Sequence, residues 1–377
     1  MTNRLAVIWI NFGPYHMARI RALKPFFDVT AIELASNQRL YQWWRGDTEP
    51  TVTTLTSGDW EDQNTLLVAF KLWSLLNRVH PVVILAPGYA NYPSICAALW
   101  GRLHGAQTIL MSESNYEDHP RKSFAESCKR ILITLLFTGG IVGGKRSASY
   151  LRRLGVPERK IAHCYDVVDN QYFASQVAQC RQNLLESDHS PYFLYVGRLA
   201  PEKNVSTLLD AHEQYTNSGG TWPLVIVGNG PLMDDLHEQA RIGIRRGSVI
   251  FSGHKSVNEF PQIYAFAGCF VLPSICEPWG LVVNEAMASS LPVLVSSHCG
   301  CADDLVEDGS NGFIIDPKRV DDIAAKMESV SKMTVEERTK MGVRSREIIC
   351  NYSPECMALE VKRITANLEQ DVAFNRS

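Results

Sequence analysis

The sequence predicts an α/β protein built from two doubly wound domains, each a parallel sheet with helices on both faces. Short apolar runs alternate with longer segments of helical periodicity through both halves of the chain. The length of 377 residues corresponds to roughly two to three domains. The composition, with 45% hydrophobic and 20% charged residues, is typical of a soluble globular protein.

The first half supplies strands and helices in alternation. Apolar runs predict strands at 5–10, 29–34, 82–86 and 108–111. Helical patterns fall near 15–26, 62–77, 92–104 and 122–137. The second half repeats this alternation from residue 192 to residue 315, so we expect each half to form its own parallel sheet.

A polar segment at 176–190 separates the two halves. It ends in Ser-Asp-His-Ser before Pro191, which are residues typical of turns and loops. We therefore expect a linker here, with one domain at 1–175, a second domain at 190–355 and a final helical segment at 356–377.

Charge, cysteine and hydropathy patterns limit the class of protein. A net charge of −3 gives no general attraction to nucleic acid or membranes. Ten cysteines without a Cys-x-x-Cys pair are typical of reduced cytosolic thiols. Residues 5–10 are too short for the apolar region of a signal peptide, and prolines interrupt the uncharged stretch 79–101. We expect a cytoplasmic protein without a transmembrane segment.

The stretch 269–295 predicts a strand, a loop and the start of a helix. The loop ends at Gly280, where the first helical amides, including that of Leu281, suit a phosphate at the carboxyl edge of a sheet. The carboxylates of Glu277 and Glu285 bracket this point and suit hydroxyl groups. A nucleotide sugar carries both kinds of group. The alternative is a solvated loop acid at Glu277 and an exposed helix acid at Glu285.

Two further strand ends contribute candidate residues. Arg198 and Lys203 follow the predicted strand 192–197 and are suited to clamping a diphosphate. The alternative for them is a surface salt bridge to Glu202. The strand 224–227 ends in the turn Gly-Asn-Gly-Pro at 228–231, which allows the backbone to approach a ligand closely.

Taken in order over roughly 190–320, these motifs resemble retaining glycosyltransferase family 4. The matching pieces are Val196-Gly197-Arg198 with Lys203, Gly228-Asn229-Gly230-Pro231, Phe251-Ser252-Gly253, Pro273-Ser274 with Glu277 to Glu285, Pro292-Val293, and Asp308-Gly309 with Gly312. The resemblance implies the GT-B architecture, in which two Rossmann-like domains face each other across a cleft. It also implies that 1–175 binds the acceptor, that 190–355 binds the nucleotide sugar, and that 356–377 crosses back to the first domain.

The resemblance assigns roles to the motif residues. Arg198 and Lys203 would bind the donor diphosphate, Glu277 the transferred sugar and Glu285 the ribose hydroxyls. The loops carrying Gly228, Asn229, Gly253, Gly280 and Leu281 would complete the donor site. One departure is Gly300-Cys301-Ala302-Asp303-Asp304, where the family usually has two glycines and a glutamate. Asp304 either replaces that glutamate or is an ordinary acid in a first helical turn, and the second interpretation is favoured.

The first domain offers fewer matches on the acceptor side. In the family the loop after the first strand approaches the donor phosphate, and here the backbone N–H of Gly13 is the candidate. His16 is either a contact for diphosphate or acceptor, or a surface residue of the first helical turn. Glu113, at a strand end, and His119, a few residues later, are both candidates for the contact to the transferred sugar.

The family reacts without a metal ion, on one face of the sugar. No cofactor or metal is expected for this chain, which also lacks the Asp-x-Asp motif of the other common glycosyltransferase fold. Cys299 and Cys301 lack a second cluster of ligands nearby, so buried structural thiols are favoured over a metal site. The donor nucleotide is expected to be UDP, and the setting polysaccharide or glycolipid assembly.

Two surface features bear on partners. The segment 121–160 holds ten basic and two acidic residues, which suits peripheral contact with the anionic inner face of a membrane and a lipid-linked acceptor. Solvated helix faces give the same pattern, and nucleic acid is not expected because no recognised module accompanies the segment. Tyr41, Trp43, Trp44 and Trp60 could stack on acceptor sugars or pack in a core.

Other classes of protein share parts of this pattern. A nucleotide-sugar epimerase of the same architecture binds the same donor without an acceptor. A non-catalytic nucleotide-sugar-binding protein needs only the donor site. A nicotinamide dehydrogenase would need Gly-x-Gly-x-x-Gly after a strand, and the turn 228–231 lacks the third glycine.

Overall fold

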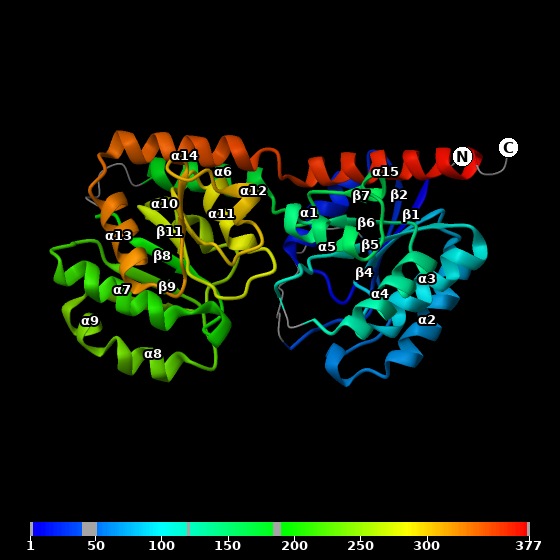
Figure 1. The fold of residues 1–377 in the computed structure, drawn as a ribbon, viewed down its shortest axis with the longest axis horizontal. Coiled ribbons are helices and arrows are strands. Elements are labelled where there is room, and N and C mark those ends of the chain that lie inside the picture. Colours follow the sequence, from blue (N-terminus) through cyan, green and yellow to red (C-terminus); the bar gives the residue numbers. More distant parts are fainter. Residues whose placement is uncertain (1–2, 40–50, 119–120, 184–189, 375–377) are drawn as a thin grey trace. The chain divides into compact units, whose positions relative to one another are not determined.

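The computed structural model describes residues 3–39, 51–118, 121–183 and 190–374, and it confirms the α/β fold class. The chain forms two compact units: residues 1–168 together with 353–377, and residues 169–352 (Figure 1). We call them unit 1 and unit 2. Among the described residues, no helix is long and apolar enough to cross a membrane.

Unit 1 is built on a parallel sheet which, in the described residues, has seven strands in the order β3-β2-β1-β4-β5-β6-β7. The strands are β1 (Arg4–Trp9), β2 (Asp28–Glu33), β3 (Val52–Thr54), β4 (Val83–Pro87), β5 (Gln107–Ser112), β6 (Gly139–Val142) and β7 (Ile161–Ala162). The direction of winding reverses between β1 and β4, which is where loops diverge and ligands bind in open α/β sheets.

Helices cover both faces of this sheet. They are α1 (Pro14–Leu23), α2 (Thr65–Val79), α3 (Tyr92–His104), α4 (Ser123–Leu136), α5 (Lys145–Arg153) and α15 (Pro354–Phe374), with short turns η1 (Trp60–Asp62) and η2 (Glu158–Lys160). On one face α2 packs against α3, and on the other α1 packs against α15 (Figure 1). Val68, Leu72 and Leu76, at helical spacing along α2, are completely buried in the core beneath it.

Unit 2 repeats the plan with six parallel strands in its described part, in the order β10-β9-β8-β11-β12-β13. They are β8 (Phe193–Val196), β9 (Leu224–Val227), β10 (Val249–Gly253), β11 (Cys269–Leu272), β12 (Val293–Ser296) and β13 (Gly312–Ile315). Winding reverses between β8 and β11, so the loops after these two strands mark the expected ligand-binding edge.

The helices of unit 2 also form two layers. They are α6 (Asn170–Asn183), α7 (Val205–Asn217), α8 (Met233–Gln239), α9 (Arg241–Arg246), α10 (Phe260–Phe266), α11 (Leu281–Ala288), α12 (Ala302–Leu305), α13 (Val320–Ser331) and α14 (Val335–Ile349), with the turn η3 (Pro201–Lys203). Helices α6, α10, α11 and α14 lie together on one face, and α7, α8 and α13 on the other (Figure 1).

The expected linker is wrong over 176–183, because these residues belong to α6. Phe173 and Val177, one helical turn apart, are each 1% exposed. The Phe173 ring meets the Tyr264 ring of α10 edge-on at 5.9 Å, and Arg181 donates to the carbonyl of Ala265 at 2.9 Å. The prediction failed because α6 is mostly polar, with few buried apolar residues, and its composition is therefore similar to that of a linker.

Glycines allow three loops to interlock at the carboxyl edge of the unit 2 sheet. The N–H of Gly197 donates to Val227 at 3.0 Å, and the N–H of Gly228 donates to Gly253 at 2.9 Å. Gly228 has φ +143°, and a Cβ there would lie 1.8 Å from the carbonyl oxygen of Gly197. The ends of β8, β9 and β10 are therefore held together by backbone contacts that no other residue type permits at position 228.

We predict that Gly228→Ala lowers the free energy of unfolding by roughly 1–3 kcal/mol more than Gly219→Ala does. Both positions have positive φ, so they share the backbone strain, but nothing lies within 4 Å of a Cβ at Gly219. Urea unfolding of both variants measures the difference. Equal losses would mean that the 197–199 and 228–230 loops move apart without cost.

Candidate active site

The carboxyl edge of unit 2 brings Lys203 and Glu277 together. Lys203 ends η3, after β8, and Glu277 lies in the loop between β11 and α11. The Lys203 ammonium forms an ion pair with Oε2 of Glu277, and the two side chains are only 20% and 11% exposed. The hydroxyl of Ser274 donates to the same carboxylate oxygen at 3.4 Å. Two charges from distant parts of the sequence thus share one partly buried position.

Backbone contacts fix the two loops that carry this pair. The N–H of Ile275 donates to the carbonyl of Glu202 at 2.9 Å. Asn204, in the left-handed conformation at the start of α7, donates through its side-chain amide to Pro273 at 3.1 Å and to Pro317 at 2.7 Å. Asn204 was not predicted as a site residue, because its position directly before a helix signals only a cap.

Helix α11 begins beside the ion pair. Gly280 precedes its first residue, Leu281, with φ +106°, and a Cβ there would lie 3.0 Å from Leu272 Cδ2. The first-turn amides of α11 therefore point out at the carboxyl end of β11, where the positive end of the helix dipole favours an anion. A lysine, a carboxylate and a helix N-terminus converge on one place.

Both acids of the central stretch are buried. Glu277 is 9% exposed and Glu285 is 2% exposed, so the alternative of a solvated loop acid and an exposed helix acid is wrong. Oε2 of Glu285 accepts a hydrogen bond from the Tyr264 hydroxyl at 2.8 Å. Tyr264 was not among the predicted residues, because nothing in the sequence of α10 indicates that it meets α11.

Arg198 behaves differently from Lys203. Its guanidinium forms an ion pair with Glu202, with side chains 44% and 36% exposed, which is the surface salt bridge of the alternative interpretation. Lys203 pairs with Glu277 instead. Beside Arg198, the N–H of Leu199 donates to the carbonyl of Asn229 at 2.9 Å, so the two predicted loops lie in contact.

The loop after β12 also reaches this region. The N–H of Gly300 donates to the carbonyl of Glu277 at 2.9 Å, and a ring nitrogen of His298 lies 3.1 Å from the carbonyl of Ile275. His298 is thus a neighbour of the site, although no motif in the sequence predicts it there. Cys301 is fully buried, and Asp304 accepts a hydrogen bond from the Tyr352 hydroxyl at 3.1 Å.

In unit 1 the loop after β1 is closed by His16. The N–H of Gly13 donates to Nδ1 of His16 at 2.9 Å, so this amide already has an acceptor within the first turn of α1. The imidazole packs against the rings of Trp9 and Phe12, with centroids 4.6 and 5.9 Å away. Burial, and next the charge of Arg19, lower the pKa of His16 well below its usual value. His16 is half-buried and neutral, not the surface residue of the alternative.

Glu113 follows the last residue of β5 and is exposed at the same edge of the unit 1 sheet. It interacts with Asp166, which is 1% exposed. Burial, and then Glu113, raise the pKa of Asp166 well above its usual range. Asp166 was not predicted, since an acid in a loop carries no signal of burial. His119 lies outside the described residues.

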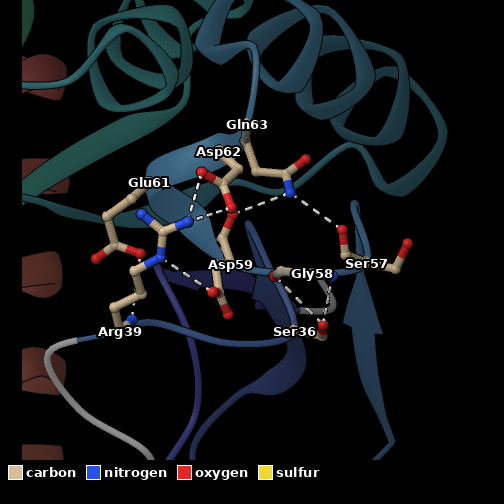
Figure 2. A network of polar contacts seen from close by, with 8 residues as sticks. All are labelled: Ser36, Arg39, Ser57, Gly58, Asp59, Glu61, Asp62 and Gln63. Atoms are coloured by element: carbon tan, nitrogen blue, oxygen red, sulfur yellow. Dashed lines mark hydrogen bonds and ion pairs between the residues drawn. The ribbon is translucent and has the colours of Figure 1, made fainter.

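A polar network joins residues 36–39 to residues 57–63 (Figure 2). Arg39 donates to Asp59 at 3.2 Å and to both carboxylate oxygens of Asp62 at 2.7 and 2.6 Å. Trp60, in η1, packs partly buried against the core, as the packing alternative expects. The predicted aromatic residues Tyr41, Trp43 and Trp44 lie outside the described residues.

We predict that His16 makes unit 1 less stable in acid. An unfolded histidine takes up a proton near pH 6.5, whereas folded His16 resists it, so stability falls as pH drops below about 6.5, by up to about 1 kcal/mol per pH unit. The His16→Asn variant keeps an acceptor for Gly13 but does not titrate. Between about pH 7.5 and about pH 5.5 its Tm should fall less than that of the wild type, and an equal fall would contradict the neutral assignment.

The chain is similar to known proteins over much of its length. A family model described as glycosyl transferases group 1 matches residues 177–348. Alpha-D-kanosaminyltransferase from Streptomyces kanamyceticus is 31% identical over 277 residues, or 68% of this chain and 71% of the relative. A sulfoquinovosyl transferase from Arabidopsis thaliana is 32% identical over 180 residues, or 47% of this chain and 33% of the relative.

Solved structures share the fold. Sucrose-phosphate synthase from Thermosynechococcus elongatus superposes with a TM-score of 0.74 at 18% identity, over 98% of this chain and 99% of that one. HepE from Anabaena, solved with UDP and glucose, gives a TM-score of 0.71 at 17% identity, over 96% of this chain and 99% of that one. At these identities the likeness shows the fold alone.

Proposed function

Because the chain belongs to the glycosyl transferases group 1 family and is therefore a glycosyltransferase, we propose that it uses a UDP-linked sugar as donor. A glycan, glycolipid or small molecule supplies the acceptor hydroxyl. The solved relative with bound UDP and glucose supports the choice of nucleotide. The new glycosidic bond forms with retention and without a metal ion.

The observation that carries this proposal is the Lys203–Glu277 ion pair at the N-terminus of α11. A diphosphate needs positive charge and amide donors, which the lysine and the first helical turn supply. Sugar hydroxyls need acceptors, which Glu277 supplies. Holding lysine and glutamate in contact keeps both charges in place before a donor arrives.

The reaction then depends on electrostatic stabilisation. The bond between the anomeric carbon and the diphosphate breaks, and the acceptor oxygen bonds to the same face of the sugar. The acceptor's proton passes to the departing diphosphate oxygen. Arg198, Lys203 and the α11 amides stabilise the negative charge that builds on the diphosphate.

Glu285 is assigned to the ribose hydroxyls of the nucleotide. The Tyr264 hydroxyl, 2.8 Å from Oε2, orients this buried carboxylate. In the loops after β9 and β10, Gly228, Asn229 and Gly253 complete the nucleotide side of the site.

The acceptor and the transferred sugar are assigned to groups of unit 1. Nδ1 of neutral His16 accepts a hydrogen bond from the N–H of Gly13. The other ring nitrogen, Nε2, therefore carries the hydrogen and is a hydrogen-bond donor. Glu113 is exposed at the same sheet edge, and its carboxylate accepts hydrogen bonds from sugar hydroxyl groups.

We expect UDP to raise the Tm of the wild type, independently of magnesium, whereas Lys203→Ala removes most of that rise. UDP at about 100 times its dissociation constant adds about 2.7 kcal/mol of stability. The control is Lys332→Ala, because Lys332 also pairs with a glutamate, Glu328, but directly follows α13 and has 72% of its side chain exposed. GDP, ADP, CMP and nicotinamide nucleotides complete the panel.

Equal rises in both lysine variants would remove Lys203 from the donor site. A rise only with a nicotinamide nucleotide would overturn the proposal. Glu277→Ala should lower kcat more than it weakens the UDP shift, since Glu277 is assigned to the sugar. Release of an epimer from a UDP-sugar without acceptor would identify an epimerase instead.

We also propose that unit 1 binds the anionic cytoplasmic face of a membrane through the segment 121–160. Along α4 an exposed apolar stripe follows helical spacing, formed by Phe124 (82% exposed), Cys128, Ile131 (59%) and Leu135 (63%). The surrounding segment is strongly basic. Apolar side chains beside basic ones are what an interfacial helix needs, and such a surface would bring the enzyme to a lipid-linked acceptor.

We expect the double variant Phe124→Ser/Ile131→Ser to lose at least about tenfold in co-sedimentation with anionic vesicles, because each apolar side chain contributes about 1.5–3 kcal/mol when fully buried. The matched control is Val335→Ser/Val343→Ser on α14, where the valines are 72% and 51% exposed. Binding of the wild type to neutral and anionic vesicles alike would count against the proposal.

A further inference from the structure

Two thiols from the two separate segments of unit 1 lie in contact. The sulfur atoms of Cys164 and Cys356 are 3.4 Å apart, although the residues are 192 positions apart in the chain. Cys164 follows β7 and is 7% exposed, whereas Cys356 is partly exposed in the first turn of α15. The proposed transfer reaction uses neither of them.

Surrounding contacts hold the thiols at this separation. The N–H of His163 donates to Glu360 at 3.1 Å, and Arg363 donates to the carbonyl of Ile161 at 3.0 Å. Glu360 and Arg363 form an ion pair at 2.8 Å. Helix α15 is therefore fastened to the segment beside Cys164, which keeps the two cysteines next to each other.

The environment of Cys356 favours a thiolate. Its N–H donates to the Ser353 hydroxyl at 3.2 Å, so it lies at the positive end of a 21-residue helix. The hydrogen bond with Cys164 lowers the pKa of Cys356 to about 7, against the opposing effects of burial and Glu360. A thiol with a pKa near the ambient pH is the most effective attacking group in disulfide exchange.

The pair also has a special place in the chain. The chain leaves unit 1 after Val168, shortly beyond Cys164, and returns at Ser353, shortly before Cys356. On the unit 2 side, the Asn170 amide donates to the carbonyls of Ile349 and Tyr352 at 2.9 and 3.1 Å. The outgoing and returning segments therefore run together, and the thiols lie where both join unit 1.

We propose that Cys164 and Cys356 form a reversible disulfide that joins the outgoing and returning segments at their base. The oxidant is a low-molecular-weight disulfide such as oxidised glutathione. The Cys356 thiolate attacks one of its sulfur atoms, forming a mixed disulfide and releasing one glutathione thiolate. Cys164 then loses its proton to solvent, attacks the Cys356 sulfur and releases the second glutathione. Two protein thiols are oxidised and one disulfide is reduced.

The disulfide has a consequence that rests on the proposed function. With the two segments joined, unit 2 becomes part of a closed covalent loop, and movement of one segment against the other is restricted. Because acceptor groups are assigned to unit 1 and donor groups to unit 2, oxidation is expected to lower kcat. The UDP-induced rise in Tm should remain, since the assigned UDP contacts belong to unit 2.

The test uses the full chain in glutathione buffers of increasing oxidised fraction, followed by alkylation and peptide mass spectrometry. We expect a 164–356 cross-link that dithiothreitol reverses. Cys164→Ser should instead stop at a mixed disulfide on Cys356, and Cys164→Ala provides a second variant if the serine perturbs folding. Cys350→Ser, which removes an exposed thiol of unit 2, should form the cross-link as the wild type does.

The proposal fails if Cys128 and Cys350 become modified while no 164–356 cross-link forms. It also fails if cross-links to other cysteines are equally frequent. Cross-linking is read without any sugar donor, so its outcome is separate from that of the proposed function. A cross-linked protein that lacks activity with every donor, even after reduction, would overturn the proposed function alone.

Discussion

The partly buried ion pair between Lys203 and Glu277 is the interaction on which the candidate site depends. Charges withdrawn from water are retained only when a partner and hydrogen bonds compensate them. Here each charge is the other's partner, and removing one leaves its counterpart uncompensated. The pair also joins the loops after β8 and β11, the strands between which the direction of winding reverses in unit 2. The ion pair therefore sets both the charge of the site and the spacing of the two loops that form it.

The strands that could be predicted from the sequence are those made of a continuous run of apolar residues. The strand at Cys269–Leu272 is an apolar run bounded by a proline, and it lies at the start of the stretch 269–295, where a strand was expected. The strand at Gly139–Val142 was missed, because glycine has no strand preference. There the glycines serve packing: a Cβ on Gly140 would lie 2.3 Å from Leu151. The need for glycine at position 140 arises from the close approach of Leu151, which the local sequence around Gly140 does not reveal.

The same distinction explains the site. The positions of Glu277 and Glu285 could be read from a strand, a loop and a helix start. Two partners that decide their environment could not, because Tyr264 and Lys203 come from other parts of the chain and meet the acids only after folding. In unit 1 nothing in the sequence indicates that a neutral histidine closes the first loop, since the burial of His16 depends on the rings of Trp9 and Phe12 that surround it.

The return of α15 to unit 1 has a consequence for biosynthesis. Ile364 and Leu368 of this helix are buried beside Gly139, so part of the unit 1 core comes from a helix that is translated after the whole of unit 2. Unit 2, contiguous from 169 to 352, has all of its chain before then. Domains usually complete folding in the order of synthesis. Here unit 1 begins before unit 2 and is completed after it, so the face that α15 covers stays uncovered while unit 2 is being synthesised.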